Sequence, residues 1–303
     1  EVTLFAKSLN YPLATDTLTF RCKINFKAGV IITPPFEDAA FTPGTVEYVD
    51  FNITNNANDV DTYRIVVEIP DASKWKGWNA VIYSNPNVGP LKRMETGATV
   101  VMLTIPPGLW KGQSCNIKLT ATSMNPKSKN QVGRESSVYV LVRAGEVYSV
   151  ELSEAEGSRP VKPGGRATIP FNVTNTGNVK DDTMTWIISD QPEGWETGLD
   201  LSLIPDGGLG QLNTATIELD AIVPENEAFG LYFITVQVYS GEDTPQKLHD
   251  EIDLMVEVRK EYKVALSTPT PRKEGEIGTV ITTKLKVRNQ GNSDDTYNMS
   301  ATS

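Results

Sequence analysis

The sequence contains little of the chemistry on which metal proteins and most hydrolases depend. Its 303 residues include one histidine, His249, and two cysteines, Cys22 and Cys115. These are too few and too far apart for a Cys/His zinc site. Acidic residues outnumber basic ones by 38 to 28, so the clustered positive charge that a nucleic-acid partner requires is not expected. We therefore predict neither a resident cofactor nor a nucleic-acid ligand.

Long apolar runs are missing as well. No stretch approaches the 18 or so apolar residues that a transmembrane helix needs, and the sequence has no secretory apolar region. Any membrane attachment is therefore expected through an anchor outside this segment. The chain begins at Glu1, which is consistent with a mature protein or a piece of a longer one.

The sequence also lacks a recognisable catalytic constellation. His249 is the only imidazole base, and it lies in a polar segment before a predicted strand. A Ser-His-Asp triad needs a serine held beside the histidine, and the G-x-S-x-G motif that often marks such a serine does not occur. We expect His249 to be a surface residue and the protein not to be an enzyme.

What the sequence does contain is an internal repeat. The segment Phe51–Asn58, FNITNNAN, recurs as FNVTNTGN at Phe171–Asn178 and as LKVRNQGN at Leu285–Asn292. A glycine-bearing turn precedes each copy, and an Asp-Thr pair follows it. The copies are 120 and 114 residues apart, so one unit of roughly 115 to 120 residues is repeated along the chain.

The repeat unit has the pattern of an all-β domain. Apolar residues alternate with polar ones before each Asn-rich turn, as in Ala167, Ile169, Phe171 and Val173. A period of two over a short run is typical of a half-buried strand. We find no amphipathic helix longer than two turns, which excludes a parallel α/β fold. About seven short strands in about 100 residues predict an immunoglobulin-like β-sandwich.

The repeat also predicts the domain boundaries. We predict four segments. Residues 1–28 are the last strands of a preceding unit, residues 29–145 and 146–260 are complete sandwiches, and residues 261–303 are the first strands of a further unit. Very short linkers, Arg143–Gly145 and Arg259–Lys260, predict an extended and fairly stiff rod. The partial units at both ends favour the interpretation that this chain is a segment of a longer repeat array. The alternative is that the ends of neighbouring subunits pair strand to strand.

Candidate binding residues fall into two groups. Sequons occur at the same repeat position at Asn52 and Asn172, and a third occurs at Asn298. If Phe51 and Ile53 point inward, Asn52 points to solvent, so these asparagines are candidate N-glycosylation sites. Three tryptophans in loop-like sequence could either stack on sugar rings or plug the open end of a sandwich, the plug being the commoner role: Trp75, Trp78 and Trp195.

Paired acids follow each Asn-rich turn, at Asp59/Asp61, Asp181/Asp182 and Asp294/Asp295. Their oxygens could contribute to a calcium site, but Asn and Asp more often close a turn by bonding their own backbone, and we favour the turn. Cys115 is in phase with core residues, and both thiols are expected to be small buried hydrophobes. A disulfide between domains or chains is the alternative.

The second unit carries the fullest set of these motifs. They are Lys162–Gly165, Asn175–Asn178, Pro192–Trp195 and Val223–Pro224. In this order they resemble the NPCBM-associated domain, found beside glycosidases and in archaeal surface proteins, and the CARDB cell-adhesion-related domain. The first unit departs from the pattern because Ala57 replaces the turn glycine. The resemblance implies an Ig-like fold and an extracellular setting, and it implies no catalytic residues.

Two functions remain open at this point. The first is a structural component of a prokaryotic, in particular archaeal, cell surface: a repeat rod in a surface layer, sheath or filament that assembles with copies of itself or other surface proteins. The alternative is an adhesin, or the carbohydrate-binding stalk of a larger secreted glycoside hydrolase, with glycans as ligands. Both place the chain outside the cell.

Overall fold

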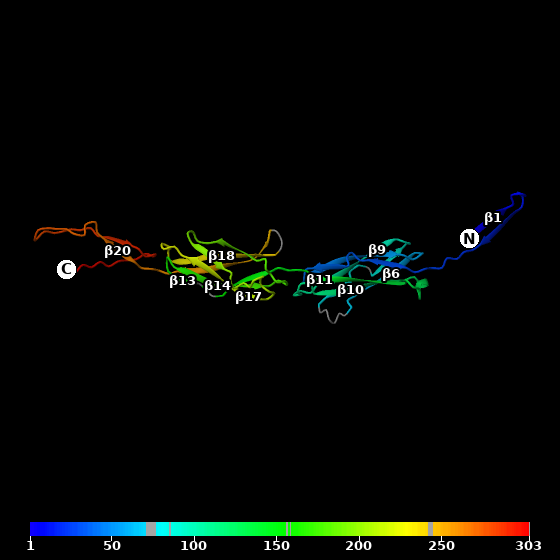
Figure 1. Ribbon diagram of the computed structural model, residues 1–303, viewed down its shortest axis with the longest axis horizontal. Coiled ribbons are helices and arrows are strands. Elements are labelled where there is room, and N and C mark those ends of the chain that lie inside the picture. The colour runs from blue at the N-terminus through cyan, green and yellow to red at the C-terminus, as the bar shows by residue number, and fades with distance from the viewer. Residues whose placement is uncertain (71–76, 85, 156, 158, 242–244, 303) are drawn as a thin grey trace. The chain divides into compact units, whose positions relative to one another are not determined.

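The computed structural model (Figure 1) describes residues 1–70, 77–84, 86–155, 157, 159–241 and 245–302. The chain divides into two compact units, Glu1–Gly145 and Glu146–Ser303. Within the described residues the regular structure is all β apart from one short 3₁₀ helix, η1 (Pro126–Ser128). No helix in this part of the chain has the length and apolar character needed to cross a membrane.

The first unit contains a complete β-sandwich, which we call the first sandwich. One sheet has the order β3-β5-β9-β7, formed by β3 (Val30–Thr33), β5 (Val46–Asn55), β9 (Thr96–Thr104) and β7 (Asn79–Ile82). The other has the order β4-β11-β10-β6-β8, formed by β4 (Asp38–Phe41), β11 (Glu135–Ala144), β10 (Ser114–Ser123), β6 (Asp61–Glu68) and β8 (Asn87–Leu91). All pairings are antiparallel except β4 with β11.

The second unit contains a second sandwich with the same strand order. One sheet has the order β12-β14-β17-β16, formed by β12 (Val150–Glu154), β14 (Arg166–Asn175), β17 (Thr214–Ile222) and β16 (Glu196–Asp200). The other has the order β13-β19-β18-β15, formed by β13 (Arg159–Val161), β19 (Lys247–Val258), β18 (Gly230–Ser240) and β15 (Thr185–Asp190). A single bridge between Asp181 and Leu209 takes the place of the β6–β8 pairing. The fold is therefore a tandem of immunoglobulin-like β-sandwiches, as the sequence predicts.

The alternating pattern explains why these segments form strands with one face in a core. Phe51 and Ile53 of β5 are 1% and 0% exposed, and Phe171 and Val173 of β14 are both 0% exposed. Their neighbours in sequence face the outside of the sheet. Each sandwich has its own hydrophobic cluster, and fully burying one such side chain stabilises the fold by about 1.5–3 kcal/mol.

Two further strand pairs lie outside the sandwiches. β1 (Val2–Lys7) and β2 (Thr15–Phe20) form an antiparallel hairpin. β20 (Val264–Ser267) pairs with β21 (Lys286–Asn289), so that Val264 lies opposite Asn289. The same register occurs for Val150 with Asn175 and for Val30 with Asn55. The division of the chain into four segments, at the boundaries given above, stays a prediction.

The two thiols differ in environment. Cys115 on β10 is 1% exposed, whereas Cys22 is exposed, and both are free. The prediction that both are buried is therefore wrong for Cys22. It follows β2, whose residues are all exposed, and it contributes to neither sandwich core.

Candidate functional site

The Asn-rich turn is the feature that all three repeat copies share, and its first asparagine closes the turn. Asn55 and Asn175 are 0% exposed. The Asn55 side-chain amide donates to the carbonyls of Asp59 and Leu91 at 2.8 and 2.7 Å, and its oxygen accepts the Ala57 N–H at 2.8 Å. Asn175 makes the equivalent three bonds, and Asn289 makes two of them. This residue satisfies buried backbone groups that would otherwise cost stability.

The second asparagine of the turn holds the chain segment that leads into each unit. Oδ1 of Asn58, Asn178 and Asn292 accepts a backbone N–H from the residue 31 positions earlier, at 2.8, 2.7 and 2.6 Å respectively. The backbone N–H of each asparagine returns a bond to the carbonyl of that same residue, at 3.2, 2.9 and 3.1 Å. We call this reciprocal pair the linker clamp; its partners in the lead-in segments are Lys27, Val147 and Glu261, the last two just after the predicted linkers.

The turn glycine makes room for the clamp. A Cβ at Gly177 would lie 2.3 Å from the Val147 carbonyl oxygen, and one at Gly291 would lie 2.2 Å from that of Glu261. Neither distance is sterically possible, so only glycine lets the linker approach this closely. The first unit has Ala57 at this position, and its return bond, from Asn58 to Lys27, is the longest of the three at 3.2 Å.

The buried acid of the turn lies at Asp61 and Asp181, which are 4% and 0% exposed. Each carboxylate accepts a hydroxyl from β10 or β18: Ser123 bonds Asp61, and Ser240 bonds Asp181. Alignment on the Asp-Thr pair matches Asp61 with Asp182, whereas the structure makes Asp181 its counterpart. Asp181 also accepts two bonds from Thr183, at 2.9 and 2.8 Å. These oxygens are engaged within the fold, and the described residues contain no cluster of three or more His, Cys, Asp or Glu side chains suited to a metal.

Trp195 is not arranged for sugar stacking. Trp195 is 3% exposed, its Nε1 donates to Glu227 at 2.8 Å, and its ring lies 5.2 Å from that of Tyr232. Trp195 thus packs on the core of the second sandwich as a plug, and the sugar-stacking alternative is wrong for it. Burial, together with the Glu227 carboxylate, raises the pKa of Tyr232 to about 12. Trp78 is half-buried against the first core, and Trp75 lies outside the described residues.

The sequon asparagines occupy three different environments. Asn52 on β5 is exposed on the outer face of its sheet. Asn172, its counterpart on β14, is half-buried and accepts the Thr216 hydroxyl at 3.0 Å. Asn298 is exposed and lies outside regular strands. Their glycosylation stays a prediction. His249 is half-buried on β19, and its ring has no hydrogen-bond partner in the described part of the chain.

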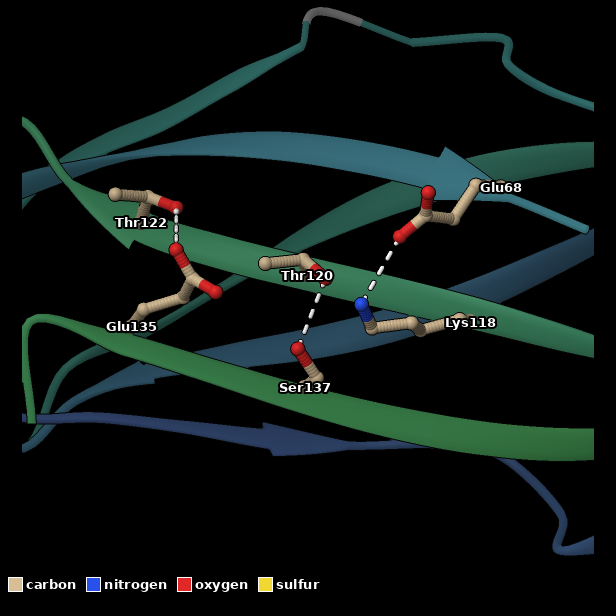
Figure 2. Close-up of polar contacts among 6 residues, drawn as sticks. All are labelled: Glu68, Lys118, Thr120, Thr122, Glu135 and Ser137. Carbon is tan, nitrogen blue, oxygen red and sulfur yellow. Dashed lines mark hydrogen bonds and ion pairs between the residues drawn. The ribbon is translucent and has the colours of Figure 1, made fainter. Parts of the chain in front are cut away.

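Two surface features of the first sandwich lack a signal in the sequence. Tyr48 and Tyr83, which are 57% and 64% exposed, form an edge-to-face pair with ring centroids 4.8 Å apart. Their planes meet at 70°, so the rings do not form a flat stacking surface. On the opposite sheet, a row of polar pairs crosses β6, β10 and β11 (Figure 2): Lys118 with Glu68 at 3.0 Å, Thr120 with Ser137 at 2.9 Å, and Thr122 with Glu135 at 3.3 Å.

No protein-family model matches the chain, and no curated protein matches it either. Solved structures that resemble it include domains 4 and 5 of the S-layer protein SbsC (16% identity, 52% of this chain and 68% of that one, TM-score 0.24). Another is mouse cadherin-23 EC22-24 (12% identity, 88% of this chain and 79% of that one, TM-score 0.45). A third is the set of fibronectin(III)-like modules of Clostridium thermocellum CbhA (12% identity, 76% of this chain and 94% of that one, TM-score 0.25). At these identities and TM-scores the likeness is limited to the fold, and no function follows from it.

Proposed function

We propose that this chain is a structural component of a prokaryotic cell surface, in which tandem Ig-like sandwiches form a stiff rod within a surface layer, sheath or extracellular filament. The observation that carries the proposal is the linker clamp, which recurs at Asn58, Asn178 and Asn292. A binding module or an enzyme has no need to fix every linker to the domain that follows it. A rod that transmits force or sets a lattice spacing does need such fixed linkers.

The clamp supports stiffness for a specific physical reason. A free linker samples many backbone conformations, and fixing one residue costs about 1–2 kcal/mol of conformational entropy. Each clamp offsets this cost with two bonds to the backbone of the lead-in segment, one from the side-chain oxygen and one from the N–H of the second asparagine. The first asparagine closes the turn on which these bonds are made. The second asparagine also donates to a carbonyl two residues before the clamped one, as where Asn58 bonds Asn25 at 2.9 Å and Asn292 bonds Arg259 at 2.8 Å.

The remaining features of the proposal come from the sequence. The motifs that resemble the NPCBM-associated and CARDB families, the acidic charge and the outward Asn52 sequon support an extracellular and archaeal setting. The outer face of β6, β10 and β11 in the first sandwich also carries paired charges and hydroxyls (Figure 2). We propose assembly with further copies or with other surface proteins.

Two measurements test the proposal. Antibodies raised against the chain should label intact cells of the source organism, and labelling only after permeabilisation would overturn the surface location. Small-angle X-ray scattering should give a single elongated particle for the wild type and a more flexible one for the triple variant N58A/N178A/N292A. Identical scattering curves for the two proteins would remove the clamp as the basis of the rod.

A further inference from the structure

A groove on the first sandwich has a composition that a purely structural role does not explain. It has a volume of about 660 Å³ and lies where the outer face of β6 and β10 meets the β10–β11 loop. The two strands contribute Arg64, Val66 and Thr122, and the loop contributes Met124–Pro126, Lys129 and Arg134. Figure 2 shows Thr122 at this end of the sheet, with Glu135 across from it.

The groove is basic on a chain whose net charge is −10. Arg64, Lys129 and Arg134 are all exposed, and none of them has an ion pair among the residues that the structure describes. Two carboxylates lie close by. Glu135 accepts the Thr122 hydroxyl at 3.3 Å, and Asp61 is buried beneath the groove, where it accepts the Ser123 hydroxyl. Lys127 is a further cation of the loop and the fourth near the groove, so positive charge exceeds negative charge here.

The loop that carries Lys127, Lys129 and Arg134 is fixed by its own hydrogen bonds. Asn125 caps the 3₁₀ helix η1 by accepting the Lys127 N–H at 3.0 Å, and Ser128 donates its hydroxyl to the Asn125 carbonyl at 2.7 Å. The Ser123 N–H donates to the Arg134 carbonyl at 2.8 Å, which closes the base of the loop. A groove held in this way loses little conformational entropy when a ligand binds.

The lining chemistry indicates the class of ligand. Arginine and lysine bind carboxylate or sulfate groups, while the Thr122 hydroxyl and the Asn125 amide suit hydroxyl groups. Met124 and Pro126 add a small apolar surface. Among the described residues that line the groove none is aromatic, so bases of a single-stranded nucleic acid would find no ring to stack on. A chain of acidic sugars offers anions and hydroxyls together.

We propose that this groove binds an acidic polysaccharide, whose carboxylate or sulfate groups are held by Arg64, Lys129 and Arg134. The groove lies on the first sandwich, and the sequence does not repeat its cations at the matching loop of the second. The corresponding segment of the second sandwich, residues 241–246, contains Glu242 and Asp243 and no lysine or arginine. The chain would then connect a repeat rod to an anionic polymer at one defined position, which goes beyond the structural role proposed above.

Isothermal titration calorimetry on the full chain tests this site with three probes: polygalacturonate oligomers, dextran sulfate and neutral dextran. We expect the wild type to bind one or both anionic probes and not dextran, and the anionic probe that binds tighter identifies the charged group. The variant R64Q/R134Q should weaken binding by at least about tenfold, since it removes two charge-assisted contacts. The control K92Q/R93Q removes two exposed cations from the β8–β9 turn of the same sandwich and should change the affinity by less than about twofold.

The control separates a site from general charge attraction. Circular dichroism and thermal melting should show that both double variants fold as the wild type does, because all four substituted side chains are exposed. Equal weakening by R64Q/R134Q and K92Q/R93Q would overturn the proposal, as would a wild type that binds neither anionic probe or that binds neutral dextran equally well.

Discussion

Asn178 and Val147 bond to each other twice, although they lie 31 residues apart. The Asn178 side-chain oxygen accepts the Val147 N–H at 2.7 Å, and the Asn178 N–H donates to the Val147 carbonyl at 2.9 Å. Val147 lies in the segment that leads into the second sandwich, and Asn178 lies in its Asn-rich turn. The turn and the linker therefore act as one structural element in each repeat.

Replacing Asn178 with alanine should release this linker. We expect the free energy of unfolding of the second sandwich to fall by about 1–2 kcal/mol, because the Val147 N–H loses its partner. Hydrogen exchange followed by mass spectrometry should show faster exchange of the amides around Val147. The matched control is Asn116→Ala, since Asn116 is exposed and its side chain has no hydrogen bond among the described residues. Unchanged exchange around Val147 in N178A would show that the clamp adds no local stability.

A second prediction concerns the buried carboxylates. Ser240→Ala leaves the 0% exposed Asp181 without its hydroxyl donor from β18, and an underbonded buried charge costs about 1.5–3 kcal/mol. Ser123→Ala should do the same to Asp61 in the first sandwich. Hydrogen exchange resolves the two sandwiches separately, so each variant should destabilise only its own. Equal loss in both sandwiches from either variant would contradict the assignment.

The alternation of apolar and polar residues and the turn motifs were sufficient to predict the strands and the repeat. The alternation around Phe171 and the turn at Asn175–Asn178 are both set within a few residues, because strand periodicity and turn chemistry depend on neighbours in sequence. The all-β fold and the two sandwiches followed from these signals. The solvent exposure of Asn52 followed from the same alternation, since its neighbours Phe51 and Ile53 are both buried.

Features that depend on distant residues could not be predicted in this way. The partner of Asn178 is a backbone N–H, which every residue but proline has, so no residue type marks it. Asp181 and Asp182 look alike in sequence, and only the position of Ser240 on β18 distinguishes them. The basic groove combines Arg64 with Arg134, which the β6–β10 pairing and the β10–β11 loop bring together.

A third prediction concerns Trp195. Replacing it with alanine should destabilise the second sandwich by about 3–5 kcal/mol, because a large buried ring leaves a cavity and Glu227 loses its indole donor. Urea unfolding followed by circular dichroism measures the change. Trp110→Ala is the matched control: Trp110 is 59% exposed, and its loss should change stability by less than about 0.5 kcal/mol. Similar losses from both variants would contradict the plug role of Trp195.

The last prediction concerns alkaline pH and Cys115. Burial raises the pKa of this thiol from 9.0 to about 11. The folded state therefore holds the proton more tightly than the unfolded state does. Its contribution to stability is complete below about pH 9 and is lost as the pH rises through 11, by an amount on the order of 2 kcal/mol. Burial also raises the pKa of Tyr63 in the same core, so the wild type alone cannot isolate the thiol.

The variant Cys115→Val isolates the thiol because valine is similar in size and does not titrate. Urea unfolding of the first sandwich at about pH 8 and about pH 11 should show a steeper loss of stability in the wild type than in C115V, since only the wild type has a thiol that ionises on unfolding. Alkylation at the lower pH gives an independent check, because the exposed Cys22 should react in the folded protein and Cys115 only after unfolding. Parallel stability losses in both proteins would mean that the Cys115 thiol does not keep its proton more tightly in the fold.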